Sequence, residues 1–124
     1  MRIHAFGEYM KHFIRVMKAL SDPSRVRVLK LLQDKELCVC NIQEFLHLAQ
    51  STVSRHMKVL EDAGLVEHRR QGTWIMYRLT EVHESEYVAA MLPHLENWLE
   101  DDKELKQMRL QRDLITKREA HCTV

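Results

Sequence analysis

The spacing of apolar residues predicts a chain made mostly of short amphipathic helices. Residues 8–20 repeat apolar side chains at helical intervals, so one face of that segment is apolar. The next helix is expected to run from Pro23 to about Gln33. Asp22 suits its N-cap, and proline suits the first helical position. Gly and Pro are scarce along the chain, which leaves no room for a long linker.

A second pair of helices is predicted within residues 41–64. Asn41 opens a pattern that resembles a capping box, which would start a short helix ending near Leu48. A further helix is expected from about Ser51 to Ala63, and Gly64 would end it. Two short helices joined by a tight turn form a helix-turn-helix.

The period changes after Gly64. Residues 65–70 and 73–79 alternate in polarity and contain β-forming side chains, and Gln71-Gly72 between them is a turn signal. These features predict a β-hairpin, the wing, over residues 65–79. The expected fold is therefore mainly α with a small β-hairpin (α+β), a winged helix-turn-helix.

The remainder, from Val82 to about Glu119, is predicted to be helical, with Pro93 kinking or dividing it. Its apolar side chains fit a dimer face and packing against the monomer's own core equally well. They are Val88, Met91, Leu92, Leu95, Trp98 and Leu99. We expect a homodimer formed through the N- and C-terminal helices, with residues 80–119 as dimerisation helices and 120–124 as a tail.

Length and composition bound the class of protein. At 124 residues with 45 % hydrophobic residues, the chain is expected to be a single domain, residues 1–124. The sequence has neither an apolar run long enough to span a bilayer nor a signal-peptide core, so we expect no membrane partner and a cytoplasmic location. The three cysteines are an odd number, and a reducing compartment favours free thiols or ligands over a disulfide framework.

Charge is distributed unevenly along the chain. The formal net charge is +1, but residues 1–80 carry +5 and residues 81–124 carry −4. The basic part contains the helix-turn-helix, so the low overall charge is compatible with a DNA partner.

The helix after residue 50 has the pattern of a DNA-reading helix. Val53, Met57 and Leu60 mark its buried side, and the opposite side is small, polar and basic. An ordinary solvated helix would have the same polar face, but the neighbouring helix and the basic hairpin favour DNA binding. The candidate DNA-binding residues are Gln50, Ser51, Thr52, Ser54, Arg55 and Lys58 on the helix, with Arg69 and Arg70 on the hairpin.

Cys38-Val39-Cys40 places two soft thiol ligands just ahead of the helix-turn-helix. An i, i+2 pair points to one side only in extended backbone. If both sulfurs bind one ion, the backbone at 38–40 must therefore be non-helical or become so. The alternative is that both cysteines act as small hydrophobes in the core.

These motifs together resemble the ArsR/SmtB family of metal- and metalloid-responsive winged-helix repressors. The resemblance rests on four segments, residues 20–25 (LSDPSR), 36–40 (ELCVC), 50–60 (QSTVSRHMKVL) and 63–66 (AGLV). It implies a homodimer that represses a resistance operon by binding double-stranded operator DNA and dissociates when As(III) or Sb(III) binds its cysteine thiolates. Some arsenic sensors carry a third cysteine where this chain has Gln43, so Cys122, from either subunit, is a candidate third ligand. A small cellular thiol could instead complete the site, or two protein thiols could suffice, in which case Cys122 is a tail thiol without this role.

The same resemblance suggests an alternative input. Zinc-sensing relatives use ligands near the start and the end of the helix after the wing, where this chain has Glu81, His83 and His94. A repressor that senses zinc, cadmium or oxidants therefore remains an alternative. An enzyme is not expected, because the sequence lacks Cys-x-x-Cys, His-Glu-x-x-His and a glycine-rich phosphate loop.

Overall fold

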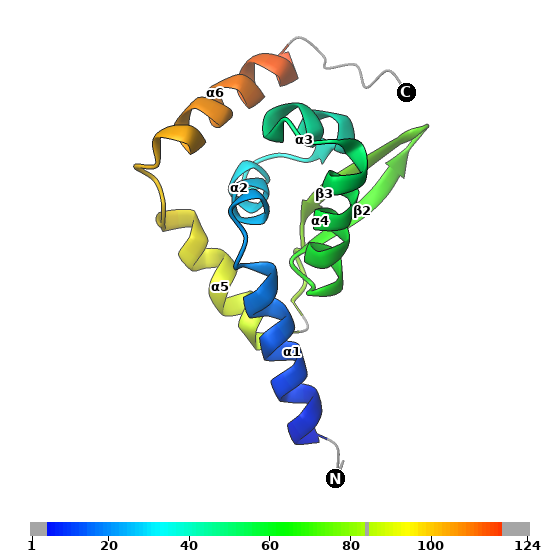
Figure 1. Ribbon diagram of the computed structural model, residues 1–124, viewed down its shortest axis with the longest axis vertical. Helices are drawn as coiled ribbons and strands as arrows, with labels where there is room; N and C mark the ends of the chain where they lie inside the picture. The colour runs from blue at the N-terminus through cyan, green and yellow to red at the C-terminus, as the bar shows by residue number, and fades with distance from the viewer. Residues whose placement is uncertain (1–4, 84, 118–124) are drawn as a thin grey trace.

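The computed structural model describes residues 5–83 and 85–117, and Figure 1 shows their arrangement. Helices dominate the described chain, as the apolar spacing predicts. The elements are α1 (Ala5–Ala19), α2 (Pro23–Leu31), β1 (Leu37–Cys38), α3 (Val39–Leu46), α4 (Gln50–Asp62), β2 (Val66–Gln71), β3 (Trp74–Leu79), α5 (Glu86–Asn97) and α6 (Lys103–Lys117).

Local capping signals fix two helix ends as predicted. Asp22 is the N-cap of α2, and its carboxylate accepts from the backbone N–H of Ser24 at 2.8 Å. At the end of α4, Gly64 takes a left-handed conformation with φ of +81°. The N–H of Leu65 then donates to the Leu60 carbonyl at 3.0 Å, which closes the last turn.

The predicted start of α3 is wrong. The helix begins at Val39 rather than after Asn41, with Cys38 in extended backbone as its N-cap. Asn41 lies inside the first turn and is buried, so its side chain cannot act as the N-cap of a capping box. The neighbouring short strand competes for residues 37–38 and fixes where the helix starts.

The wing is present and belongs to a larger sheet than predicted. Strands β2 and β3 pair antiparallel through a turn at Gly72, whose φ is +64°. Strand β1 adds to the other edge of β3, so the described strands form one sheet in the order β1-β3-β2. Leu37 pairs with Tyr77, and Cys38 pairs with Met76. Two residues are too short a run for periodicity to reveal, so the sequence does not predict β1.

The C-terminal helices divide at a different place from the one predicted. Pro93 lies inside α5, and the chain breaks after Asn97, where Leu99 has φ of +63°. Lys30 is fully buried and supplies the reason. Its ammonium donates to the carbonyls of Leu95 at 2.6 Å and Trp98 at 2.7 Å, so a side chain from α2 satisfies the end of α5.

The core lies between the helices, with α1 and α5 side by side at one end and α6 across α2 and α3 at the other (Figure 1). Val88, Leu92 and Leu95 are buried in the chain's own core. For these three of the six apolar residues between Val88 and Leu99, packing within the monomer is therefore favoured over a dimer face. Trp98 and Leu99 remain exposed. Among the described helices none is both long and apolar enough to cross a membrane.

Candidate nucleic-acid interface and thiol site

Helix α4 presents the face that its sequence predicts. Val53, Met57 and Leu60 are all 0 % exposed and anchor the helix in the core. Helix α3 packs against α4, so the two form the helix-turn-helix. The opposite face is open to solvent, which leaves its side chains free to enter a groove of DNA.

The predicted DNA-binding residues of α4 share this solvent-facing side. Gln50, Ser51, Ser54, Arg55 and Lys58 are exposed, and Thr52 is half-buried at the flank. Gln50 is the first residue of α4 rather than the residue before it. Lys58 forms an i, i+4 ion pair with Asp62 at 3.3 Å, which an exposed lysine can exchange for a phosphate.

The two arginines predicted on the wing have different surroundings. Arg69 is engaged by Glu36, whose carboxylate accepts from Nε at 2.8 Å and from Nη2 at 2.5 Å. The hydrogen bonds from Arg69 hold the pKa of Glu36 below its usual range. Arg70 is exposed and has no side-chain partner within residues 5–83 and 85–117. Arg70 is therefore the less engaged of the two arginines, and its contact with DNA stays a prediction.

The two thiol residues straddle the junction of β1 and α3. Cys38 ends the strand and is 2 % exposed, whereas Cys40 lies in the first turn of α3 and is half-buried. The backbone is extended at Cys38 (φ −78°, ψ 158°) and helical from Val39 onward. Binding of one ion by both sulfurs requires residues 38–40 to be non-helical or to become so, and the backbone is already non-helical only at Cys38.

The chemical states of the two sulfurs differ. Cys40 is a free thiol, and burial raises its pKa against the weaker opposite effect of a backbone hydrogen bond. Cys38 is disulfide-bonded, so the expectation of free thiols throughout is wrong for this residue. Its Sγ also lies 3.0 Å from the side-chain oxygen of Asn41. Cys122, the candidate third ligand, lies outside the described residues.

The alternative ligands, two of them between β3 and α5 and one near the end of α5, occupy three separate environments. Glu81 faces Arg78 at 3.9 Å, and the Nδ1 atom of His83 is buried without a partner in the described chain. His94 stacks on Trp98, with ring centroids 5.0 Å apart. Over the described ranges no three His, Cys, Asp or Glu side chains are grouped as metal ligands.

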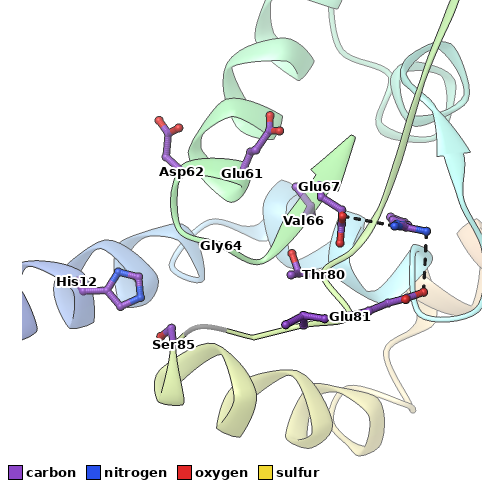
Figure 2. A pocket seen from close by; sticks show the side chains of 11 residues that line it. His12, Glu61, Asp62, Gly64, Val66, Glu67, Thr80, Glu81 and Ser85 are labelled. Atoms are coloured by element: carbon purple, nitrogen blue, oxygen red, sulfur yellow. Dashed lines mark hydrogen bonds and ion pairs between the residues drawn. The ribbon is translucent and has the colours of Figure 1, made fainter. Parts of the chain in front are cut away.

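Figure 2 shows a cleft of about 710 Å³ at the root of the wing, bounded by α1, the end of α4 and the start of α5. Its lining is acidic, but two of its carboxylates, Glu67 and Glu81, already face Arg78. A third, Glu61, pairs with His68 of the wing at 2.5 Å. These side-chain contacts make the cleft part of the joint between the wing and the helices.

Two residues with clear structural roles carried no prediction. Glu36 and Arg25 lie in two of the segments that carry the family resemblance, residues 36–40 and 20–25, but the sequence alone indicates no function for either. Arg25 donates to the Ala19 carbonyl at 2.8 Å and to the Lys18 carbonyl at 2.9 Å. The partner of Glu36 follows from the pairing of β1 with β3, which has no signal in the sequence.

A helix-turn-helix followed by a hairpin with an exposed basic side chain defines the chain as a winged helix-turn-helix protein. The model of the bacterial regulatory protein arsR family matches residues 22–68. The chain is 38 % identical over 112 residues to the arsenic resistance transcriptional regulator ArsR1 of Pseudomonas putida, covering 82 % of this chain and 86 % of that protein. It therefore belongs to the ArsR family of bacterial transcriptional regulators.

Other relatives belong to the same family, but their names record resistance to different metals or metalloids. The chain is 32 % identical over 81 residues to the cadmium resistance transcriptional regulatory protein CadC homolog of Staphylococcus aureus, covering 64 % of this chain and 67 % of that protein. Among solved structures, a homodimeric winged helix-turn-helix domain from Mycobacterium bovis, a possible ArsR-family transcriptional regulator, matches with a TM-score of 0.63. That match is 30 % identical and covers 78 % of this chain and 84 % of that domain.

The family and the fold predicted from the sequence are confirmed by these comparisons. The chain is an ArsR/SmtB-family transcriptional repressor, a DNA-binding regulator rather than an enzyme.

Proposed function

We propose that this chain represses a metalloid-resistance operon as a homodimer and leaves its operator when As(III) or Sb(III) binds the thiols of Cys38 and Cys40. The observation that carries the proposal is the position of these two cysteines. They stand at the entry to α3, and α3 packs directly on the DNA-reading helix α4. A change of backbone at this entry therefore acts on the orientation of α4.

The donor chemistry of the site fits a trivalent metalloid. Thiol sulfur is a soft ligand, and the reduced form of Cys38 together with Cys40 offers two such atoms. Each thiol that reacts with arsenous acid gives up its proton to a leaving hydroxyl, so that one As–S bond forms and one water is released. Nothing is oxidised or reduced in this exchange. A protonated thiol can react in this way, so the raised pKa of Cys40 does not prevent binding.

The placement of α6 supports Cys122 of the same chain as the third sulfur ligand. Asp113 near the end of α6 lies 3.3 Å from Lys35, which is three residues ahead of Cys38. Arg112 donates to the Leu31 carbonyl at 2.9 Å, so the end of α6 is fixed beside the segment that leads into β1. The five residues from Lys117 to Cys122 span at most about 18 Å.

The homodimer is supported by exposed apolar side chains on the N-terminal helix and near the end of α5. They are Tyr9, Met10, Phe13 and Ile14 on α1, with Trp98 and Leu99 after α5. A two-fold dimer would bury this apolar surface. It would also present two copies of α4 to the two halves of an operator.

Operator release by different agents tests the proposal. Fluorescence anisotropy of the reduced protein on the DNA upstream of its own gene is followed during separate titrations with arsenite, antimonite, zinc, cadmium and hydrogen peroxide. We expect release by arsenite and antimonite at low micromolar concentrations, about 10⁻⁶–10⁻⁵ M, a range in which sensor proteins bind their ions. Release by zinc or cadmium alone would contradict the proposal and favour Glu81, His83 and His94 as ligands. Release by peroxide alone would favour an oxidant sensor.

A further inference from the structure

One row of residues crosses the whole sheet from the thiol segment to the wing. Met76 of β3 pairs with Cys38 of β1 on one side and with Arg69 of β2 on the other. Cys38 and Arg69 therefore lie opposite the same residue of the central strand β3, one on each side of it. The side chain of Arg69 extends this connection, because it bonds to Glu36, two residues ahead of Cys38.

The contact between Glu36 and Arg69 is of a strong and directional kind. Two nitrogens of the guanidinium donate to the two carboxylate oxygens at 2.8 Å and 2.5 Å, and Nη2 also lies 3.2 Å from the side-chain oxygen of Gln71. A bidentate pair depends on geometry as well as on charge, so a small displacement of either backbone breaks it. The residue after Glu36, Leu37, is 1 % exposed and pairs with Tyr77 of β3, which fixes the backbone beside Glu36.

The wing has a second side-chain connection. A single hydrogen bond of 2.5 Å joins His68, the neighbour of Arg69, to Glu61 of α4. The bidentate pair thus joins the wing to the thiol segment, and this hydrogen bond joins the wing to the DNA-reading helix. The wing lies between these two contacts, with Arg70 exposed next in the strand.

We propose that Glu36 is a positioning residue that couples the thiol segment to the wing through Arg69. This inference rests on the proposed function, in which Cys38 and Cys40 bind one inducer. Sulfurs at i and i+2 share a side only in extended backbone, so their joint use requires the first turn of α3 to open. The chain that enters this turn includes Glu36, so opening the turn breaks the bidentate contact and removes this side-chain link between β2 of the wing and the thiol segment.

The consequence for affinity follows from linkage. A contact present in the DNA-binding form and absent in the inducer-bound form contributes to the difference between the two operator affinities. Removing the contact weakens the ligand-free protein on its operator and leaves the loaded protein unchanged. The ratio of the two affinities therefore falls.

The test compares Glu36→Gln with Glu67→Gln in the full-length reduced protein. Glu67 is a matched control, because it pairs with Arg78 across the wing at 3.4 Å and, in the described part of the chain, forms no hydrogen bond or ion pair with the thiol segment. Operator affinity is measured with and without arsenite, and arsenite binding to the free protein is measured by sulfur–arsenic absorbance. For Glu36→Gln we expect the affinity ratio to fall about fivefold or more while arsenite still binds. Glu67→Gln should keep the wild-type ratio.

A second readout reports on the wing without any ligand. Trp74 lies at the start of β3, so in a Trp98→Phe background its fluorescence anisotropy reports wing motion. Glu36→Gln should lower this anisotropy, and the exchange Glu36→Arg with Arg69→Glu should restore part of it. An unchanged affinity ratio, or unchanged Trp74 anisotropy in Glu36→Gln, would overturn the inference. Failure of arsenite to release the wild type would instead overturn the proposed function, and the Trp74 measurement would still decide the role of Glu36.

Discussion

Arg25 reaches from α2 to His56 on the inner side of the DNA-reading helix, with 3.2 Å between Nη1 and Nδ1. A guanidinium can only donate, so Nδ1 of His56 is the acceptor. The same arginine holds the last carbonyls of α1 through its other nitrogens. One side chain therefore connects three helices and fixes the position of α4 relative to α1.

Removal of either member of this pair should weaken both folding and DNA binding. A double-mutant cycle with Arg25→Met and His56→Ala is expected to give a coupling of about 0.5–1.5 kcal/mol in the free energy of unfolding. Urea unfolding measures the coupling, and operator anisotropy measures the accompanying loss of affinity. Additive effects of the two substitutions would show that the contact contributes nothing.

The exposed face of α4 should supply sequence readout through Arg55. Arg55→Ala is expected to cost about 1–3 kcal/mol of operator affinity and to relax base preference at one position. Lys58→Ala is the control, because a phosphate contact weakens binding to all sequences and lowers the salt slope by about one. Unchanged operator affinity of Arg55→Ala would mean that the helix is turned differently on DNA.

The thiols should be needed for release and not for DNA binding. Cys38→Ser and Cys40→Ser are each expected to bind the operator and to remain bound when arsenite is added, because each lacks one sulfur ligand. Cys122→Ser should still be released, at higher arsenite concentrations if its sulfur is the third ligand. Operator anisotropy in the presence of a thiol reductant measures all three. Normal release of Cys40→Ser would exclude the Cys38–Cys40 site.

The exposed apolar face of α1 should be the one that mediates dimerisation. Met10→Glu is expected to give a monomer, because a charge would be placed in a surface that is otherwise apolar. Leu110→Glu on α6 is the matched control, because Leu110 is 65 % exposed and Met10 is 62 % exposed. Leu110 lies within the predicted dimerisation helices, residues 80–119, but outside the surface of α1 and the end of α5 proposed above. Light scattering after size-exclusion chromatography distinguishes the outcomes. A monomer from Leu110→Glu and a dimer from Met10→Glu would place the interface on α6.

Stability should depend on pH through Glu100 at the junction of α5 and α6. Its carboxylate accepts from Lys30 at 2.8 Å and from Arg109 at 2.9 Å, and these hydrogen bonds hold its pKa below the usual range. A carboxyl group whose pKa is lowered on folding stabilises the fold above its ordinary pKa, and this contribution is lost as the pH falls through the lowered value.

Glu100→Ala should therefore be less stable than the wild type at neutral pH and approach it in acid. Glu96→Ala is the control, since only the backbone carbonyl of Glu96 faces Lys30. Thermal unfolding over a series of pH values checks the trend. A difference between Glu100→Ala and the wild type that is constant down to acid pH would contradict it.

Local signals were sufficient for much of the fold and for the DNA-reading face. The apolar spacing of Val53, Met57 and Leu60 gave the phase of α4 correctly, because a helix has a fixed period. Gly64 marked the end of this helix, since only glycine takes the required left-handed conformation at little cost.

The features that the sequence did not reveal are those decided by distant residues. Lys30 ends α5 from another helix, so Pro93 was the only visible candidate for the break. Strand β1 forms because it pairs with β3. Since the sequence does not predict this strand, it could not predict the partner of Glu36 either. The sequence predicts that Arg69 contacts DNA, because it gives no sign that the Glu36 carboxylate binds this arginine.

The N-cap of α3 has a consequence for the concentration at which the protein responds. Cys38 holds the position where Ser, Thr or Asp would normally bond to the first turn, and its side chain forms no such cap bond within the described residues. A capping side chain would stabilise that turn by about 0.5–2 kcal/mol. Such a cap would make the open turn less populated, and a ligand that selects the open turn would then bind only at a higher concentration.

The substitution Cys38→Ser would therefore have two effects. It removes a sulfur ligand, and it adds an N-cap hydroxyl that stabilises the first turn of α3. Alanine removes only the sulfur, so a comparison of Cys38→Ser with Cys38→Ala separates ligand loss from turn closure. If Cys38 binds the inducer as proposed, the same residue also sets the response threshold of the switch.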